Sequence, residues 1–123
     1  MTDEEQEDRR RAVRMFYQKY QTGARKRGLD FNLSEWEFAT LISEPCHYCG
    51  LPPQQHVYRD KATSMRALFT VFTASGIDRL DNERGYSWEN CVPCCEWCNR
   101  AKFNRSADEY LAWLEHVVSH FRG

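Results

Sequence analysis

Every cysteine in this 123-residue chain belongs to a Cys-x-x-Cys pair. The three pairs are Cys46/Cys49, Cys91/Cys94 and Cys95/Cys98. A single pair of this kind can be a redox motif, whereas two pairs that are separated in the chain are typical of a four-cysteine zinc site. Residues 2–8 are acidic and lack the apolar run of a signal peptide, so we expect an intracellular protein with reduced thiols. The cysteines therefore predict a structural Zn²⁺, with disulfides as the alternative.

Two pairs are enough for a tetrahedral zinc site. Cys46/Cys49 must be one of them, because the other two pairs are adjacent in the chain. For the second we favour Cys95/Cys98, since residues three apart share one face of a helix. Cys91 and Cys94 would then be small buried hydrophobic residues. The 45 residues between Cys49 and Cys95 far exceed the roughly 15 to 20 of a zinc ribbon, so the metal would close a large loop.

The charges are segregated, although the formal net charge is only −1, with 17 Lys+Arg against 18 Asp+Glu. Residues 9–29 contain eight basic residues and no acidic one. This stretch is either a solvated helix face or a surface that contacts phosphates, because Lys and Arg displace counterions condensed on nucleic acid. No apolar run approaches the roughly 18 residues that a membrane helix needs, so no membrane partner is expected.

The spacing of apolar residues predicts three longer helices. The first runs from about Glu4 into the early twenties. The second and the last begin at capping boxes, which are Ser34 with Glu37 and Ser106 with Glu109. A short helix should begin near Cys95. Residues 67–74 suit a strand and residues 51–66 a loop, and residues 77–88 should form two short strands around a turn.

Several polar and aromatic residues have a structural interpretation from the sequence alone. We expect Asp81, Asn82 and Glu83 to form a turn, since Asx side chains satisfy turn backbones. His116 and His120 lie one turn apart near the end of the last helix, where histidine is common without a metal. The four tryptophans are expected in the core, namely Trp36, Trp88, Trp97 and Trp113.

A longer pattern joins the cysteines to a polar segment between them. It reads Cys46-x-x-Cys49-Gly50, Ile77-Asp78-Arg79-x-Asp81-Asn82, Gly85-Tyr86, Asn90, and Pro93-Cys94-Cys95-x-x-Cys98-Asn99-x-x-Lys102. This pattern resembles the HNH endonuclease family, and in particular its compact phage and large-virus branch with four zinc-binding cysteines. The similarity covers about residues 46–103, and the helices on either side also fit that branch.

The resemblance implies an α+β fold with a zinc-stapled ββα-metal core. In such a core, two antiparallel strands and a helix hold one divalent cation, usually Mg²⁺ or Mn²⁺, against a phosphate. We expect residues 1–123 to form a single domain. Residues 1–45 would be a basic helical extension, residues 46–103 the HNH-like zinc core, and residues 104–123 a C-terminal helix.

The resemblance also assigns the site residues. Asp78 and Asn90 would hold the divalent cation, and Asn99 takes the last position of the motif. Arg79 stands where the family has its base, a histidine. A guanidinium stays protonated and is a poor base, but it can bind a phosphate through two hydrogen bonds. Asn90 could instead cap the segment that follows it.

Three accounts of the missing base remain open. Another group could accept the proton, with His47 and His56 as candidates. The metal alone could generate hydroxide. Alternatively, the site could be catalytically silent.

The sequence thus predicts a metal-dependent endonuclease that acts on nucleic acid, with DNA favoured. The alternatives are a catalytically silent HNH-fold nucleic-acid-binding protein and a protein-binding zinc scaffold. The oligomeric state is left open. The residues expected to contact nucleic acid are Arg9, Arg10, Arg11, Arg14, Arg25, Lys26, Arg27, Arg100 and Lys102.

Overall fold

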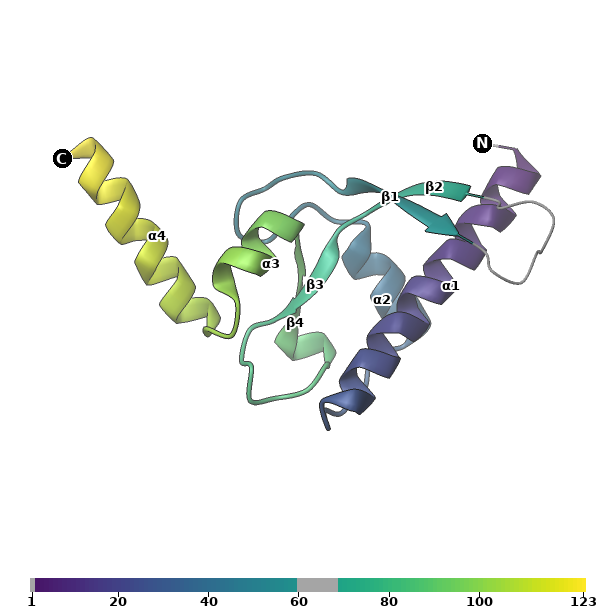
Figure 1. Cartoon of the computed structure of the whole chain (residues 1–123), viewed down its shortest axis with the longest axis horizontal. Helices are drawn as coiled ribbons and strands as arrows, with labels where there is room; N and C mark the ends of the chain where they lie inside the picture. Colours follow the sequence, from purple (N-terminus) through teal and green to yellow (C-terminus); the bar gives the residue numbers. More distant parts are fainter. Residues whose placement is uncertain (1, 60–68) are drawn as a thin grey trace.

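Along the described part of the chain, two helices precede the strands of two small sheets and two helices follow them (Figure 1). The computed structural model describes residues 2–59 and 69–123. Within these ranges it contains four α-helices, one 3₁₀ turn and two two-stranded sheets, which confirms the predicted α+β class. In chain order the elements are α1 (Asp3–Lys26), α2 (Glu35–Ile42), β1 (Gln54–Arg59), β2 (Phe69–Ala74), β3 (Gly76–Arg79), η1 (Trp88–Asn90), β4 (Cys91–Cys94), α3 (Glu96–Lys102) and α4 (Ala107–Arg122).

Both predicted capping boxes are present. The Ser34 hydroxyl accepts a hydrogen bond from the Glu37 amide at 3.0 Å, and the Glu37 carboxylate accepts one from the Ser34 amide at 2.9 Å. Ser106 and Glu109 make the same pair of bonds at the start of α4. These bonds satisfy backbone amides that the first turn of a helix leaves without partners. Helix α1 extends to Lys26, slightly beyond its predicted end.

The first sheet contains a strand that the sequence did not predict. Strand β1 pairs antiparallel with β2, with Gln54 opposite Ala74 and Arg59 opposite Phe69. The prediction of a loop over residues 51–66 is therefore wrong for Gln54–Arg59, because backbone pairing with β2 can hold even a polar segment in a sheet. The strand predicted at residues 67–74 is confirmed from Phe69 onward. The rest of the predicted loop, residues 60–66, and the first two residues of the predicted strand, 67 and 68, lie outside the described residues.

The second sheet is the expected pair of short strands around a turn. Strand β3 runs antiparallel to β4, with Asp78 opposite Val92, and β4 begins at Cys91, later than predicted. The connecting loop touches the chain ahead of α2, where the Tyr86 amide donates to the Asp30 carbonyl at 2.9 Å. A Cβ on Gly85 would lie 2.4 Å from that same carbonyl oxygen. Only glycine fits this contact, and it fixes the loop that leads to β4.

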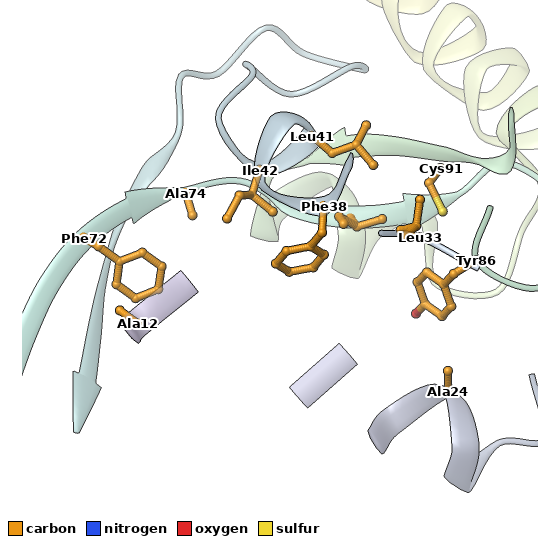
Figure 2. Packing of buried hydrophobic residues seen from close by; sticks show 11 residues of the cluster. Ala12, Ala24, Leu33, Phe38, Leu41, Ile42, Phe72, Ala74, Tyr86 and Cys91 are labelled. Atoms are coloured by element: carbon orange, nitrogen blue, oxygen red, sulfur yellow. The ribbon is translucent and has the colours of Figure 1, made fainter. Parts of the chain in front are cut away.

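Phe38 of α2 is the centre of the main core. It is fully buried, and its ring meets those of Phe16, Tyr17 and Tyr20 from α1 at centroid distances of 5.5, 5.3 and 5.4 Å. Figure 2 shows Phe38 between Phe72 on one side and Tyr86 on the other. Edge-to-face aromatic contacts of this kind add stabilisation beyond burial alone. The apolar stripe of α1 thus covers α2 and links both sheets.

The tryptophans are on the surface, which contradicts the predicted core positions. Trp36, Trp88, Trp97 and Trp113 are 73%, 44%, 79% and 59% exposed. Phenylalanine and tyrosine rings from α1 and α2 occupy the core instead. Helix α4 points away from the body of the molecule in Figure 1, and its buried residues are Ala107 and Tyr110 in its first turn. Among the described residues, no helix has the length and apolar content needed to cross a membrane.

Candidate functional site

Four cysteine sulfurs gather where the chain leaves α2 and enters α3. The Sγ atoms of Cys46, Cys49, Cys95 and Cys98 all lie within 4.8 Å of one another. Tetrahedral zinc with Zn–S bonds of about 2.3 Å places its sulfurs roughly 3.8 Å apart, and Cys49 and Cys95 are already at 3.6 Å. The predicted choice of pairs is confirmed, and the cluster has the donors and the spacing of a zinc site.

The electrostatics of the four thiols also favour a bound cation. Burial, together with negative charge on Cys46, raises the pKa of Cys98 to about 12. Burial would also raise the pKa of Cys46, but hydrogen bonds from the Cys95, Cys49 and Tyr48 backbone outweigh it and lower that pKa to about 7. Thiolates this close repel one another unless a metal ion neutralises them. The donor set therefore fits a soft divalent cation such as Zn²⁺.

The remaining pair of cysteines is part of the packing. Cys91 and Cys94 are 4% and 1% exposed, and they belong to the two clusters of buried apolar residues. Burial raises the pKa of the Cys91 thiol to about 11 and also raises that of Cys94. Both residues are thus neutral and apolar, as the sequence interpretation expected for the pair that does not bind metal.

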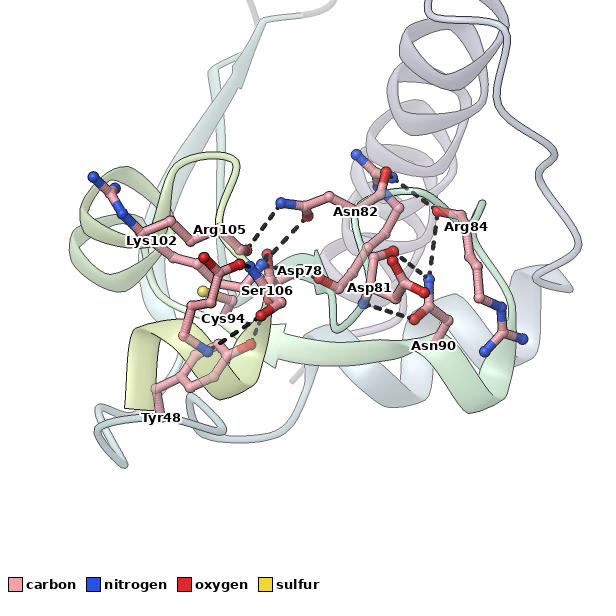
Figure 3. A network of polar contacts seen from close by, with 12 residues as sticks. Tyr48, Asp78, Asp81, Asn82, Arg84, Asn90, Cys94, Lys102, Arg105 and Ser106 are labelled. Carbon is pink, nitrogen blue, oxygen red and sulfur yellow. Dashed lines mark hydrogen bonds and ion pairs between the residues drawn. The ribbon is translucent and has the colours of Figure 1, made fainter. Parts of the chain in front are cut away.

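Asp78 contacts two residues from the segments that carry the cysteine cluster. Its side chain is buried, its Oδ2 accepts a hydrogen bond from the Tyr48 hydroxyl at 2.6 Å, and its Oδ1 lies 3.1 Å from the Lys102 ammonium (Figure 3). Tyr48 sits between Cys46 and Cys49, and Lys102 follows Cys98 by one helical turn. The two partners of Asp78 are therefore placed by the segments that the cysteine cluster holds together.

Burial and the bond to Asp78 keep the Tyr48 hydroxyl protonated. Loss of contact with solvent raises the pKa of Tyr48, and its hydrogen bond to the Asp78 carboxylate raises it further. The hydroxyl therefore remains a hydrogen-bond donor at neutral pH. It fixes the orientation of the carboxylate and leaves Oδ1 for a cation.

Lys102 is inside the molecule, whereas the sequence analysis placed it among the phosphate-contacting surface residues. It is 0% exposed. Its Nζ donates to the Arg79 carbonyl at 3.0 Å and to Asn82 Oδ1 at 3.3 Å, in addition to Asp78. An ammonium that is removed from water is tolerated only when it is paired and hydrogen-bonded, as it is here. In this structure Lys102 is the counter-ion of Asp78.

Asn90 and Asp78 have separate hydrogen-bond partners in this structure, although the resemblance assigned both to one cation. It is 2% exposed, and its Oδ1 accepts a hydrogen bond from the Asp81 amide at 2.9 Å. Its Nδ2 donates to the carbonyls of Asp81, Gly85 and Arg84 at 3.0, 2.9 and 3.4 Å. Figure 3 shows the two residues in separate parts of the network. Asn90 holds the loop that connects β3 to η1. The alternative interpretation expected it to cap the segment that follows it, whereas these bonds go to the loop that precedes it.

Arg79 folds back on the same loop. Its Nη1 donates to the carbonyls of Asn82 and Arg84, the latter at 2.8 Å, and its guanidinium carbon lies 5.5 Å from the centroid of the Tyr86 ring. The predicted turn is present, since Asp81 Oδ1 accepts a hydrogen bond from the Glu83 amide at 3.0 Å. These contacts place Arg79 next to the site without committing all five of its N–H donors.

Asn99 lies on the exposed surface of α3. It lies one helical turn before Lys102, which is buried and meets Asp78 of β3. Asn99 is therefore near this pair along the helix, but its side chain is exposed.

The two candidate bases are in different environments. His56 packs among aromatic rings, with centroids 5.6 Å from Phe16 and 5.5 Å from Phe72, and one of its ring nitrogens lies 2.9 Å from the Ala74 carbonyl. His47 is exposed, and its ring meets that of Tyr48 edge-on at 5.0 Å. Of these two, His47 is therefore beside the partner of Asp78, while His56 supports the packing of β1 on α1.

From Arg9 onward, α1 carries basic side chains and no acidic ones, in contrast to its acidic first turns. Most of these side chains are exposed, and Arg9 is partly buried. Two make ion pairs at 3.2 Å, Arg10 with Glu7 and Arg14 with Glu35, and Arg100 of α3 pairs with Glu96 at 2.6 Å. Exposed pairs of this kind contribute little and exchange readily. The exposed members are Arg10, Arg11, Arg14, Lys19, Arg25 and Lys26, and the exposed Arg27 follows directly after the helix.

A groove follows this basic face. It runs between α1 and α2, and its lining includes Arg10, Arg14 and the exposed Trp36. The spacing of Phe38, Leu41 and Ile42 already places Trp36 on the opposite face of α2, and this signal could have identified it as a surface residue.

Comparison with known proteins gives two matches. No family model matches the chain. An uncharacterised protein of Acanthamoeba polyphaga mimivirus is 28% identical over 106 residues, which are 86% of this chain and 17% of the viral protein. The chain thus spans less than a fifth of that relative.

The rare-cutting HNH restriction endonuclease PacI superposes with a TM-score of 0.60 at 26% identity, over 90% of this chain and 80% of PacI. With its four-cysteine cluster, this match confirms the resemblance to the HNH endonuclease family and the HNH-like fold.

Proposed function

We propose that this protein is a metal-dependent endonuclease that hydrolyses phosphodiester bonds in nucleic acid, with DNA as the favoured substrate. One observation carries the proposal. The buried Asp78 carboxylate lies where β3 meets α3, beside the four-cysteine cluster, in a fold that superposes on an HNH restriction endonuclease. A buried carboxylate with oriented partners in such a place is a functional-site candidate.

The oxygens around Asp78 suit a hard divalent cation. Asp78 Oδ1, the Arg79 carbonyl and Asn82 Oδ1 all face the same point, which in this structure is the Lys102 ammonium. Carboxylate, carbonyl and amide oxygens are the ligands that such cations take. Asn90 does not fit as a ligand, because its Oδ1 is bound to the Asp81 amide. A Mg²⁺ or Mn²⁺ ion at Asp78 would polarise a phosphoryl oxygen and activate water.

The other residues have roles that follow from their positions. His47 accepts the proton of the attacking water, since it is exposed beside Tyr48. Arg79 uses its remaining N–H donors on the scissile phosphate, and Asn99 contacts the substrate from the exposed face of α3. Zinc at the four cysteines fixes both segments that contact Asp78.

The basic face of α1 supplies the substrate surface. In the proposal its arginines and Lys26 follow the phosphate backbone, since exposed cations release condensed counterions from nucleic acid. Trp36, at 73% exposure in the groove beside Arg10 and Arg14, offers a ring on which an unpaired base could stack.

The test is a nicking assay with zinc-loaded protein and supercoiled plasmid. We expect relaxed or linear DNA when Mg²⁺ or Mn²⁺ is added and none when it is omitted. Asp78→Asn keeps the volume of the side chain but removes its charge, and should abolish the product. Cleavage that survives this change would overturn the assignment of Asp78. Single-stranded DNA and RNA, tested in parallel, identify the substrate.

A second candidate is a nucleic-acid-binding protein with a silent site. Two observations favour it: Arg79 occupies the place of the usual histidine, and Lys102 already neutralises Asp78. This candidate predicts salt-sensitive binding without cleavage under any divalent ion. Arg79→His tests why such a site would be silent. If the site lacks only a base, this change should give it cleavage activity.

A further inference from the structure

The Lys102 ammonium sits in a pocket of three oxygens. Its Nζ lies 3.1 Å from Asp78 Oδ1, 3.0 Å from the Arg79 carbonyl and 3.3 Å from Asn82 Oδ1. The side chains of Lys102 and Asp78 are 0% and 6% exposed. An ammonium has three N–H donors, so this group is matched one to one with its acceptors and is shielded from water.

These three oxygens are also a ligand set for a metal ion. One comes from a carboxylate, one from a main-chain carbonyl and one from a side-chain amide, which are the donor types of hard divalent cations. A divalent ion at this point would stand within contact distance of the ammonium. Like charges at such a distance repel strongly in a buried site. The oxygens can therefore hold the lysine or the metal, but not both.

We infer that Lys102 and a divalent cation bind the same three oxygens in turn, so that Lys102 is a built-in competitor of the metal. Lys102 is the last residue of α3, and the turn that follows it is exposed. The exchange requires the Lys102 stem to swing toward this exposed turn, which lies one helical turn beyond Cys98. The displaced ammonium then becomes available to a phosphate. The metal would bind the three oxygens, and the substrate phosphate would bind the released Lys102.

This inference rests on the proposed function, because the competing cation is the one that the nuclease would use. It adds that a residue of the chain itself sets how readily that cation enters. It also differs from the roles assigned by the family resemblance, in which Asp78 and Asn90 were to share the ion.

The test measures Mn²⁺ binding, by electron paramagnetic resonance of the unbound ion, to zinc-loaded protein. Lys102→Met keeps the length of the stem and its apolar contacts but removes the charge. We expect this variant to bind Mn²⁺ at least about tenfold more tightly than the natural chain, because the competing charge is gone. Lys102→Arg keeps the charge and should show no gain. Affinity in Lys102→Met that is equal to or weaker than that of the natural chain would overturn the inference.

Two further variants control for folding and for the location of the ion. The double variant Asp78→Asn with Lys102→Met removes both buried charges, and it should lose the gain in Mn²⁺ affinity. A gain that persists in it would place the ion elsewhere and overturn the inference. If Lys102→Met unfolds because Asp78 is left unpaired, Mn²⁺ should restore its circular dichroism and zinc content, and failure to do so contradicts competition.

The readout is independent of cleavage. A natural chain that never nicks nucleic acid would refute the proposed function while leaving the exchange intact. If the natural chain cleaves nucleic acid but Lys102→Met binds Mn²⁺ with the same affinity as the natural chain, only the exchange is refuted.

Discussion

The substitution Asn90→Asp tests whether Asn90 organises the loop or binds a metal. The two side chains have nearly the same shape. A carboxylate can still accept the hydrogen bond from the Asp81 amide, but it cannot make the three donations of Nδ2. If Asn90 were a cation ligand, aspartate would serve at least as well. If it holds the loop, the change should damage the fold.

The size of the effect follows from the contacts. Two donations have good lengths, 3.0 Å to Asp81 and 2.9 Å to Gly85, and the third is long at 3.4 Å. Each hydrogen bond contributes about 1 kcal/mol, and a buried polar group left without a partner costs about 1 to 3 kcal/mol. Asn90 is 2% exposed, so the new carboxylate would also face carbonyl oxygens away from water. We expect a loss of about 3 kcal/mol or more in the free energy of unfolding.

The assay is urea denaturation of zinc-loaded protein followed by circular dichroism, with a thermal melt as a second measure. A loss of this size should lower the melting temperature by roughly 10 °C. Asn104→Asp is the matched control, because Asn104 is exposed in the turn after α3, and it should stay within about 0.5 kcal/mol of the natural chain. A variant Asn90→Asp as stable as this control, with tighter Mn²⁺ binding, would refute the loop role.

Two other predictions concern the metal and the substrate surface. Cys98→Ala should lose its bound Zn²⁺ and the circular dichroism of the folded protein. Cys94→Ala should keep about one zinc per chain by metal analysis. Loss of zinc in both variants would contradict the choice of ligands. Lys26→Ala should reduce the slope of log affinity for duplex DNA against log salt by about 1, and Arg122→Ala at the tip of α4 should leave it unchanged. Equal effects from both would mean that α1 is not the contact surface.

Local signals explain what could be predicted from the sequence. A capping box needs only two residues three apart, so Ser34 and Ser106 mark their helices without knowledge of the rest of the fold. The zinc ligands were identifiable for the same reason, since each Cys-x-x-Cys pair is a local unit, and the helical spacing of Cys95 and Cys98 indicated the second pair, which the structure confirms. The resemblance to the HNH family supplied the order in which these units combine.

Features that depend on distant contacts could not be predicted. Lys102 looks like a surface residue until Asp78, 24 positions earlier, is placed against it. Strand β1 exists because β2 pairs with it, not because its own residues favour a strand. Trp36 was expected in the core because of its large apolar ring, although Phe38, Leu41 and Ile42 form the buried face of the same helix. The division into segments 1–45, 46–103 and 104–123 stays a prediction, as do the catalytic roles of the site residues.

The rate of plasmid nicking by zinc-loaded Asp78→Asn, relative to the natural chain, tests the central claim most directly. Both proteins must first show equal zinc content and the same circular dichroism, because Asp78 also pairs with the buried Lys102. We expect Mn²⁺-dependent nicking by the natural chain and a nicking rate at least about 100-fold lower in the variant. Equal rates in the two proteins would contradict the assignment of the reaction to Asp78.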